Sequence, residues 1–220
     1  MHTIAHHLTD PILTAYAAGT LPEAFNLVVA THLSLCDECR SQLAAHEAVG
    51  GAVLEDAGEA VMSEDALDAC FARIASSPDA PIRVGHNHHA KRKGSLFPEP
   101  LRDYVGGDLD AVNWRPAGLG VRQAILATSK NASVRLLYIP AGAEVPDHGH
   151  NGTEMTLVLK GAFRDEFARF GAGDIEICDP NVEHTPVAEP GEDCICLAAT
   201  DAPLKFSGLL PKIAQPFLRI

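Results

Sequence analysis

Two groups of side chains that bind metals lie far apart in this sequence. The first comprises His32, Cys36 and Cys39, whose imidazole and thiolates suit a closed, structural zinc site. The second lies in the C-terminal half and comprises imidazoles and a carboxylate, which suit zinc, iron, manganese or nickel with an open coordination position. The chain is therefore expected to bind two metals with two different tasks.

The first group fits a helical setting. Residues four apart share a helix face, which brings His32 near Cys36, and the two-residue gap to Cys39 lets the second thiolate approach the same ion. Tetrahedral zinc needs a fourth ligand. His6 and His7, just before the first expected helix, are both candidates.

The second group fits a strand. His148 and His150 are two apart, so an extended segment points both side chains to one face. Glu154 can return to that face across the Asn151-Gly152 turn, and His184 would come from a separate strand pair. These four residues form a complete set of metal ligands.

The elements that must position these residues change along the chain. Helix start signals at Asp10-Pro11 and at Thr20 to Glu23 predict short helices, and a third helix follows Cys36 as far as the paired glycines 50–51. A fourth follows residues 63–65. Four short helices bury little surface, so a zinc ion would be a useful staple.

The rest of the sequence has the short, regularly spaced apolar runs of an antiparallel β-sandwich or barrel. Before them lies a stretch rich in Pro, Gly and charge that is typical of a linker. We therefore expect an α + β protein with two domains. The expected parts are a helical domain at 1–85, a linker at 86–95 and a β-domain at 96–220, with strands at 134–139, 156–159, 162–167, 174–178 and 194–197.

Composition narrows the function. The 220 residues carry a net charge of −12, and residues 1–76 hold 2 basic and 11 acidic side chains, which argues against direct nucleic-acid binding and favours a basic partner. The six cysteines are not spaced like a disulfide scaffold. Since neither a membrane-spanning run nor a secretory signal is visible, we expect no membrane contact and a cytoplasmic protein.

The spacing around the second group resembles the first motif of the cupin superfamily. Gly142, His148, His150, Glu154 and Gly161 match it at every position. The second cupin motif is kept at Gly173 and His184, but Asp179, Asn181 and Ala188 stand where Pro, Gly and Asn are usual. The resemblance implies a double-stranded β-helix barrel, with His148, His150, Glu154 and His184 as ligands of zinc or another divalent metal.

The N-terminal half resembles the zinc-binding anti-sigma domain, and its union with a cupin resembles the ChrR-type anti-sigma factors over nearly the whole chain. By this resemblance His7, His32, Cys36 and Cys39 are the zinc ligands. It also implies a repressor that binds an extracytoplasmic-function (group IV) sigma factor 1:1, until a stress signal, typically oxidative, acts through the cupin. The apolar anchors for that partner would be Ile12, Leu13, Tyr16, Phe25, Leu27 and Val28, which core packing between helices explains equally well.

A different class of function stays open at this point. The open coordination that the cupin ligands offer suits a metal-dependent enzyme, such as a dioxygenase or isomerase, with the helices as an interaction module. The sequence contains no legible acid or base beyond the ligands, which favours the regulator over the enzyme.

Overall fold

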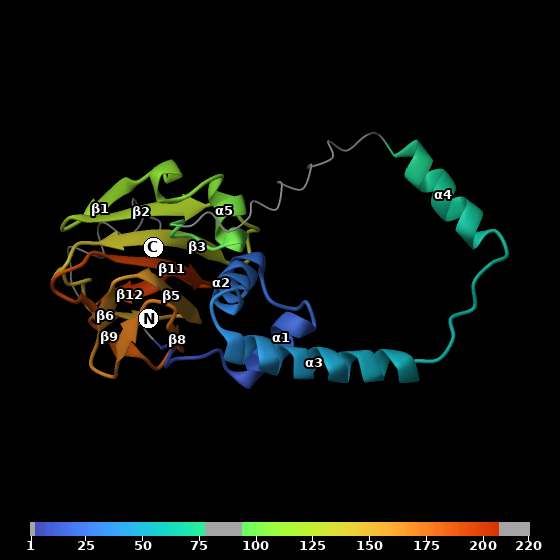
Figure 1. The fold of residues 1–220 in the computed structure, drawn as a ribbon, viewed down its shortest axis with the longest axis horizontal. Coiled ribbons are helices and arrows are strands. Elements are labelled where there is room, and N and C mark those ends of the chain that lie inside the picture. Colours follow the sequence, from blue (N-terminus) through green and yellow to red (C-terminus); the bar gives the residue numbers. More distant parts are fainter. Residues whose placement is uncertain (1–2, 78–93, 207–220) are drawn as a thin grey trace.

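The computed structural model of the chain describes residues 3–77 and 94–206. Its N-terminal part is helical and its C-terminal part is built from antiparallel sheets, as the sequence predicts. Figure 1 shows α2 at one end of the sheets with α1 beside it, α3 extending away from them, and α4 standing away from the rest of the described chain. The helices are α1 Asp10–Ala17, α2 Glu23–Leu33, α3 Asp37–Asp56, α4 Ala66–Ser76 and α5 Glu99–Val105.

The first two helices begin close to the predicted signals, but the predicted caps do not form. Thr9 precedes α1 and Pro22 precedes α2, and neither helix has a side-chain cap. Pro11 occupies the first turn of α1, where its missing N–H costs nothing, and the Cys36 thiol caps α3 by accepting a hydrogen bond from the Cys39 N–H at 3.4 Å. The expected end of the third helix at Gly50-Gly51 is wrong, because α3 continues to Asp56. Two glycines cost only about 2 kcal/mol of helix propensity, and helix formers flank them on both sides.

The β part is made of three antiparallel sheets. The large sheet has the order β1-β2-β3-β11-β5-β8, and the two small sheets have the orders β10-β6-β7 and β12-β4-β9. The strands are β1 Arg115–Gly118, β2 Val121–Leu126, β3 Ser133–Ile139, β4 His148–His150, β5 Glu154–Lys160, β6 Ala162–Arg164, β7 Arg169–Gly171, β8 Ile175–Cys178, β9 Glu183–His184, β10 Val187–Ala188, β11 Cys194–Thr200 and β12 Leu204–Phe206.

Two expectations about these strands need correction. The strands of the described residues do not close into a hydrogen-bonded barrel. The strands of the two small sheets are only two or three residues long, and they do not pair with the edge strands of the large sheet. The single strand expected over 162–167 is also wrong. The chain turns after Arg164, where Asp165 accepts hydrogen bonds from the N–H groups of Phe167 and Ala168, and returns as β7.

The helical and β parts share one hydrophobic core. Helix α2 lies across β11, β5 and β3, and its buried face joins the same cluster as the sheet residues Leu136, Leu157 and Leu197. At the edge of this contact the Glu23 carboxylate accepts hydrogen bonds from the Tyr104 hydroxyl at 2.9 Å and from the Ser129 N–H at 2.7 Å. Helix α2 is thus packed against the large sheet in this structure.

Asp108 organises the entry into the β part. Its carboxylate accepts hydrogen bonds from the backbone N–H groups of Leu96, Phe97 and Leu109, and from the Ser95 hydroxyl. Its bond to Leu109 caps the short 3-10 helix Leu109–Ala111, and its other bonds hold the segment before α5. Asp108 therefore fixes the start of the C-terminal part, and none of these four partners lies on α1 to α4.

Candidate metal centres

The four predicted ligands of the N-terminal site come together in the structure. Nδ1 of His7 lies 3.3 Å from Sγ of Cys36 and 3.7 Å from Sγ of Cys39, and Nε2 of His32 lies 3.3 Å from Sγ of Cys39. All four donor atoms are within 4.8 Å of one another. We call His7, His32, Cys36 and Cys39 the N-terminal cluster.

Three separate elements supply this cluster. His7 precedes α1, His32 lies in the last turn of α2, and the two cysteines occupy the start of α3. The neighbouring His6 points elsewhere, with Nε2 3.2 Å from the Arg169 carbonyl oxygen. Of the two candidates that the sequence left open, the structure brings His7 to the cluster.

The donor set fits zinc. Zn–N bonds of about 2.0 Å and Zn–S bonds of about 2.3 Å place the ligand atoms of a tetrahedral site roughly 3.3 to 3.8 Å apart, and the three nitrogen–sulfur distances above are 3.3 to 3.7 Å. Burial lowers the pKa of His32 to about 4 and so keeps the imidazole in the neutral form that binds metals. Burial also raises the pKa of Cys39 to about 11, so this buried thiolate needs a cation beside it.

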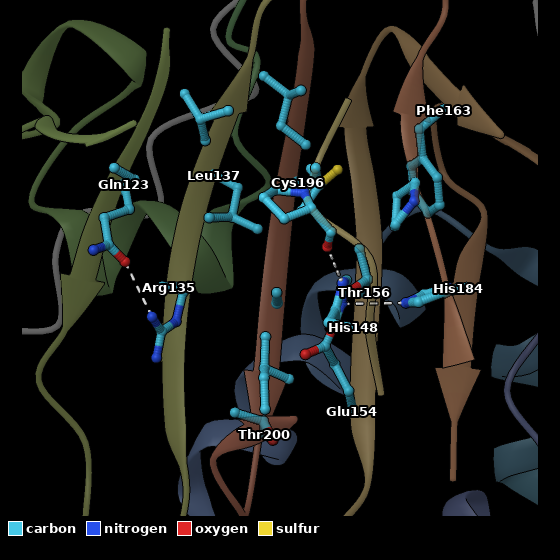
Figure 2. A pocket seen from close by; sticks show the side chains of 18 of the residues that line it. Gln123, Arg135, Leu137, His148, Glu154, Thr156, Phe163, His184, Cys196 and Thr200 are labelled. Carbon is cyan, nitrogen blue, oxygen red and sulfur yellow. Dashed lines mark hydrogen bonds between the residues drawn. The ribbon is translucent and has the colours of Figure 1, made fainter. Parts of the chain in front are cut away.

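Three of the four predicted cupin ligands also converge. His148 and His150 lie on β4, and His184 lies opposite His148 on β9 in the antiparallel pair. Nε2 of His148 is 3.3 Å from Nε2 of His184, and Figure 2 shows the two rings facing each other. We call His148, His150 and His184 the cupin cluster.

Two observations indicate that this cluster suits a divalent metal. Both ring nitrogens of His150 are buried without a hydrogen-bond partner, which is costly unless a cation or water occupies the site. Burial lowers the pKa of both His148 and His150, which favours neutral imidazoles. When bound, a metal would supply a Lewis acid and these imidazoles would hold it.

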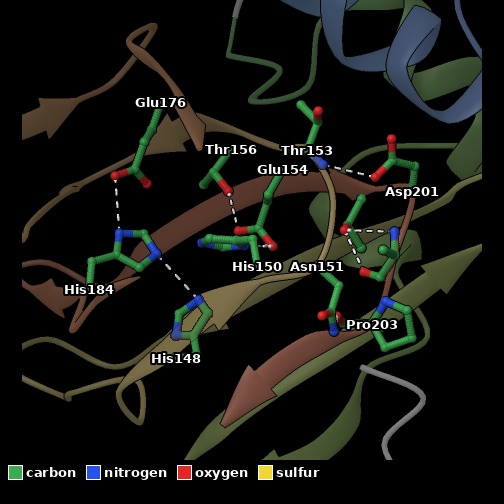
Figure 3. Close-up of polar contacts among 12 residues, drawn as sticks. His148, His150, Asn151, Thr153, Glu154, Thr156, Glu176, His184, Asp201 and Pro203 are labelled. Atoms are coloured by element: carbon green, nitrogen blue, oxygen red, sulfur yellow. Dashed lines mark hydrogen bonds and ion pairs between the residues drawn. The ribbon is translucent and has the colours of Figure 1, made fainter. Parts of the chain in front are cut away.

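Glu154, the fourth predicted ligand, lies at the side of the cluster. Its carboxylate is 3.9 Å from Nδ1 of His150 and accepts a hydrogen bond from the Thr156 hydroxyl at 3.1 Å (Figure 3). It is outside the group of donor atoms that lie within 4.8 Å of one another. The structure places it at the edge of the site, within reach of His150.

Sequence reasoning missed the acidic residues that orient His184. Nδ1 of His184 is 3.1 Å from Asp165 Oδ2 and 3.2 Å from Glu176 Oε1. Burial lowers the pKa of His184, but its bonds to Glu176 and Asp165 outweigh this and raise the pKa to about 9. A carboxylate on Nδ1 turns Nε2 toward the cluster, as is usual for histidines that bind metals.

An apolar cavity of about 480 Å³ opens beside the cupin cluster. Figure 2 shows His148, Glu154 and His184 at one side and Leu137, Phe163 and Cys196 on the walls. Polar groups are few. Among them are Gln123 and Arg135, which hydrogen-bond to each other at 3.0 Å, so the cavity suits a mostly apolar small molecule.

The apolar residues predicted to bind a partner are mostly inside the protein. Leu13, Phe25, Leu27 and Val28 are buried in the shared core, while Ile12 and Tyr16 are half-buried against it. The packing alternative therefore holds for the first four, and in this conformation they cannot anchor a partner. The sheet that covers α2 comes from distant sequence, so the helical pattern alone could not reveal it.

The exposed apolar side chains lie farther along the helical part. Leu67, Phe71 and Ile74 form one stripe on α4, and each is about 60% exposed. Val53 and Leu54, at the end of α3, are exposed as well. The spacing of Leu67, Phe71 and Ile74, four and then three residues apart, was visible in the sequence. It indicates an apolar helix face, and no other predicted element was available to cover that face.

Comparison with known proteins identifies the family. The chain is 59% identical over 218 residues to the anti-sigma-E factor ChrR of Cereibacter sphaeroides, which covers 99% of this chain and 100% of that protein. The chain belongs to the ChrR family of anti-sigma factors. A family model described as the ChrR cupin-like domain matches residues 103–203. ChrR is a regulator and not an enzyme, which decides against the alternative that the sequence left open.

A solved ChrR structure agrees with this fold. The crystal structure of Rhodobacter sphaeroides SigE in complex with the anti-sigma ChrR matches with a TM-score of 0.77 and 57% identity, covering 90% of this chain and 100% of that one. An acetylacetone dioxygenase from Acinetobacter johnsonii matches at 16% identity and a TM-score of 0.40, over 44% of this chain and 74% of its own. That weaker likeness carries no argument about activity.

No helix in the described part of the chain is long and apolar enough to cross a membrane.

Proposed function

We propose that this chain is an anti-sigma factor that binds an extracytoplasmic-function sigma factor 1:1 and represses transcription. The observation that carries the proposal is membership of the ChrR family over the whole chain. The acidic helical part supports it, because complementary charge favours a partner with basic surfaces for polymerase and promoter. In the proposed complex the chain makes no direct contact with nucleic acid. The proposed location is the cytoplasm, where the polymerase acts.

The proposal assigns different tasks to different parts of the chain. Residues 1–85 bind the sigma factor, 86–95 link the parts, and 96–220 form the cupin domain; most of the proposed linker lies outside the described residues. A structural zinc held by the N-terminal cluster would fix α2 and α3 relative to each other. The exposed apolar stripe on α4 would supply the contact surface.

A stress signal, of which oxidation is the leading class, would act through the cupin domain. The cupin cluster and Glu154 would hold zinc or another divalent metal beside the apolar cavity. Ligand binding or chemical change in that cavity would alter the sigma-binding half. The shared core between α2 and the sheet supports such communication, because neither part can move without repacking the other.

Co-expression tests the main proposal. We expect the full chain to co-purify 1:1 with the extracytoplasmic-function sigma factor of its own organism, and to prevent transcription from a promoter of that sigma factor in vitro. The control is a housekeeping sigma factor, which should neither bind nor be inhibited. Failure to bind the cognate sigma factor would reject the proposal.

His148→Ala tests the task of the cupin domain. The variant should lose the cupin metal but keep the N-terminal zinc, and its sigma affinity should stay within about tenfold of the wild type, a difference of 1.4 kcal/mol. In a reporter strain exposed to a panel of oxidants, the ratio of induced to basal expression should fall towards one. Complete loss of sigma binding by the purified variant would contradict this division of tasks.

A further inference from the structure

The N-terminal segment 4–6 is held against the cupin half by several contacts, and the carboxylate of Asp174 is at their centre. Oδ1 of Asp174 accepts hydrogen bonds from the backbone N–H groups of Ala5 at 2.6 Å and His6 at 3.0 Å. The Ile175 N–H donates to the His6 carbonyl oxygen at 3.3 Å, so the segment lies along the start of β8. We call these contacts the Asp174 clasp.

The turn before β8 is shaped for this contact. Asp174 is only 1% exposed, and its second oxygen accepts a hydrogen bond from the Gly171 N–H at 2.8 Å. Gly173 has φ +95°, and a Cβ added there would lie 2.7 Å from the Ile4 side chain. A buried carboxylate with three backbone donors and a glycine against a side chain indicate a built interface.

One end of the clasp reaches the N-terminal cluster. His7, a member of the cluster, directly follows the fastened residues Ala5 and His6. Movement of the turn would therefore disturb the position of His7, one of the four donor side chains.

The other end of the clasp reaches the cupin cluster. Glu176 is two residues beyond Asp174 along β8, and its carboxylate lies 3.2 Å from Nδ1 of His184 (Figure 3). Nε2 of His184 in turn faces His148. A continuous set of contacts thus joins the two clusters through one short strand.

We propose that Asp174 is a positioning residue that couples the cupin cluster to the N-terminal cluster. A change at the cupin histidines shifts His184 and Glu176, β8 carries the shift to the clasp, and the release of segment 4–6 loosens the N-terminal cluster. This inference rests on the proposed function, in which the cupin domain reports a signal to the sigma-binding half. The Asp174 clasp is the contact through which the signal reaches the N-terminal cluster.

A double-mutant cycle on the full chain tests the coupling. His148→Ala and Asp174→Ala are made singly and together, and two rates are measured by mass spectrometry: alkylation of Cys36 and Cys39 by iodoacetamide, and hydrogen exchange of the Ala5 and His6 amides. We expect His148→Ala to raise both rates about fivefold or more in the presence of Asp174. In the Asp174→Ala background, where the clasp is already open, it should raise neither.

Asp108→Ala is the matched control. It also removes a carboxylate that binds several backbone N–H groups, but none of those groups belongs to segment 4–6 or to either cluster, so the effect of His148→Ala should persist in full. An equal effect of His148→Ala with and without Asp174, or no effect in either background, would overturn the coupling. Circular dichroism checks that each variant is folded.

A gentler variant covers the case in which Asp174→Ala does not fold. Ile4→Ala alters only the segment and leaves the β8 turn intact, and it should reduce the effect of His148→Ala; an unreduced effect overturns the coupling. Sigma binding is measured on the same samples. If the wild type binds the sigma factor but the mutant cycle shows no coupling, only the role of the clasp is rejected. If the wild type does not bind the sigma factor, the proposed function is rejected.

Discussion

Replacing Cys39 with serine is expected to abolish sigma binding and to unfold the helical part. Cys39 is fully buried, and its Sγ lies between Nε2 of His32 at 3.3 Å and Nδ1 of His7 at 3.7 Å. Structural zinc contributes about 10 to 16 kcal/mol to the folding of small zinc domains, so its loss should destabilise the junction of α1, α2 and α3, which the N-terminal cluster joins. We expect loss of one zinc per chain and an affinity loss above about a hundredfold, roughly 2.7 kcal/mol.

Cys194→Ser is the control for this experiment. Cys194 is as fully buried as Cys39 but belongs to the second hydrophobic core, within the β part, and is a member of neither cluster. Its replacement should lower the thermal stability of the β part and leave N-terminal zinc and sigma binding unchanged. Metal analysis and a pull-down measure both properties. A Cys39→Ser chain that keeps its N-terminal zinc and binds the sigma factor normally would refute the structural role of the metal.

The two clusters were predictable because their geometry is largely local. His32 and Cys36 are one helical turn apart, and His148 and His150 are one strand repeat apart, so spacing alone places each pair on one face. His184 was reachable through the cupin motif. Its pairing with His148 across β9 and β4 is what that motif encodes.

The residues that sequence reasoning missed depend on contacts between distant segments. Asp165 and Glu176 orient His184, and Asp174 holds segment 4–6, yet nothing near them in the sequence distinguishes these acids from solvated ones. The anchors expected on α2 are buried for the same reason. A helix face buried in the core and one that binds a partner have the same spacing of apolar residues. Only the position of the sheet shows that the apolar face of α2 is the first kind.

We expect the sigma factor to contact the exposed apolar stripe on α4. Alanine in place of Phe71 should lower sigma affinity at least tenfold, because truncation of an aromatic side chain at the centre of an interface commonly costs more than 1 to 2 kcal/mol. Leu67 and Ile74 lie on the same stripe, and the triple alanine variant should lose binding altogether. Isothermal titration calorimetry with the purified sigma factor measures each loss.

The stability of these variants separates a docking surface from a structural one. Since no residue of α4 is buried, Phe71→Ala should leave the thermal unfolding temperature of the free chain unchanged within about 1 °C, whereas a core residue would lower it by several degrees. Phe167→Ala is the matched control, because Phe167 is 69% exposed against 60% for Phe71 but lies on the cupin half. It should bind the sigma factor normally. Equal losses for both phenylalanines would mean that exposed apolar area, and not the α4 stripe, governs binding.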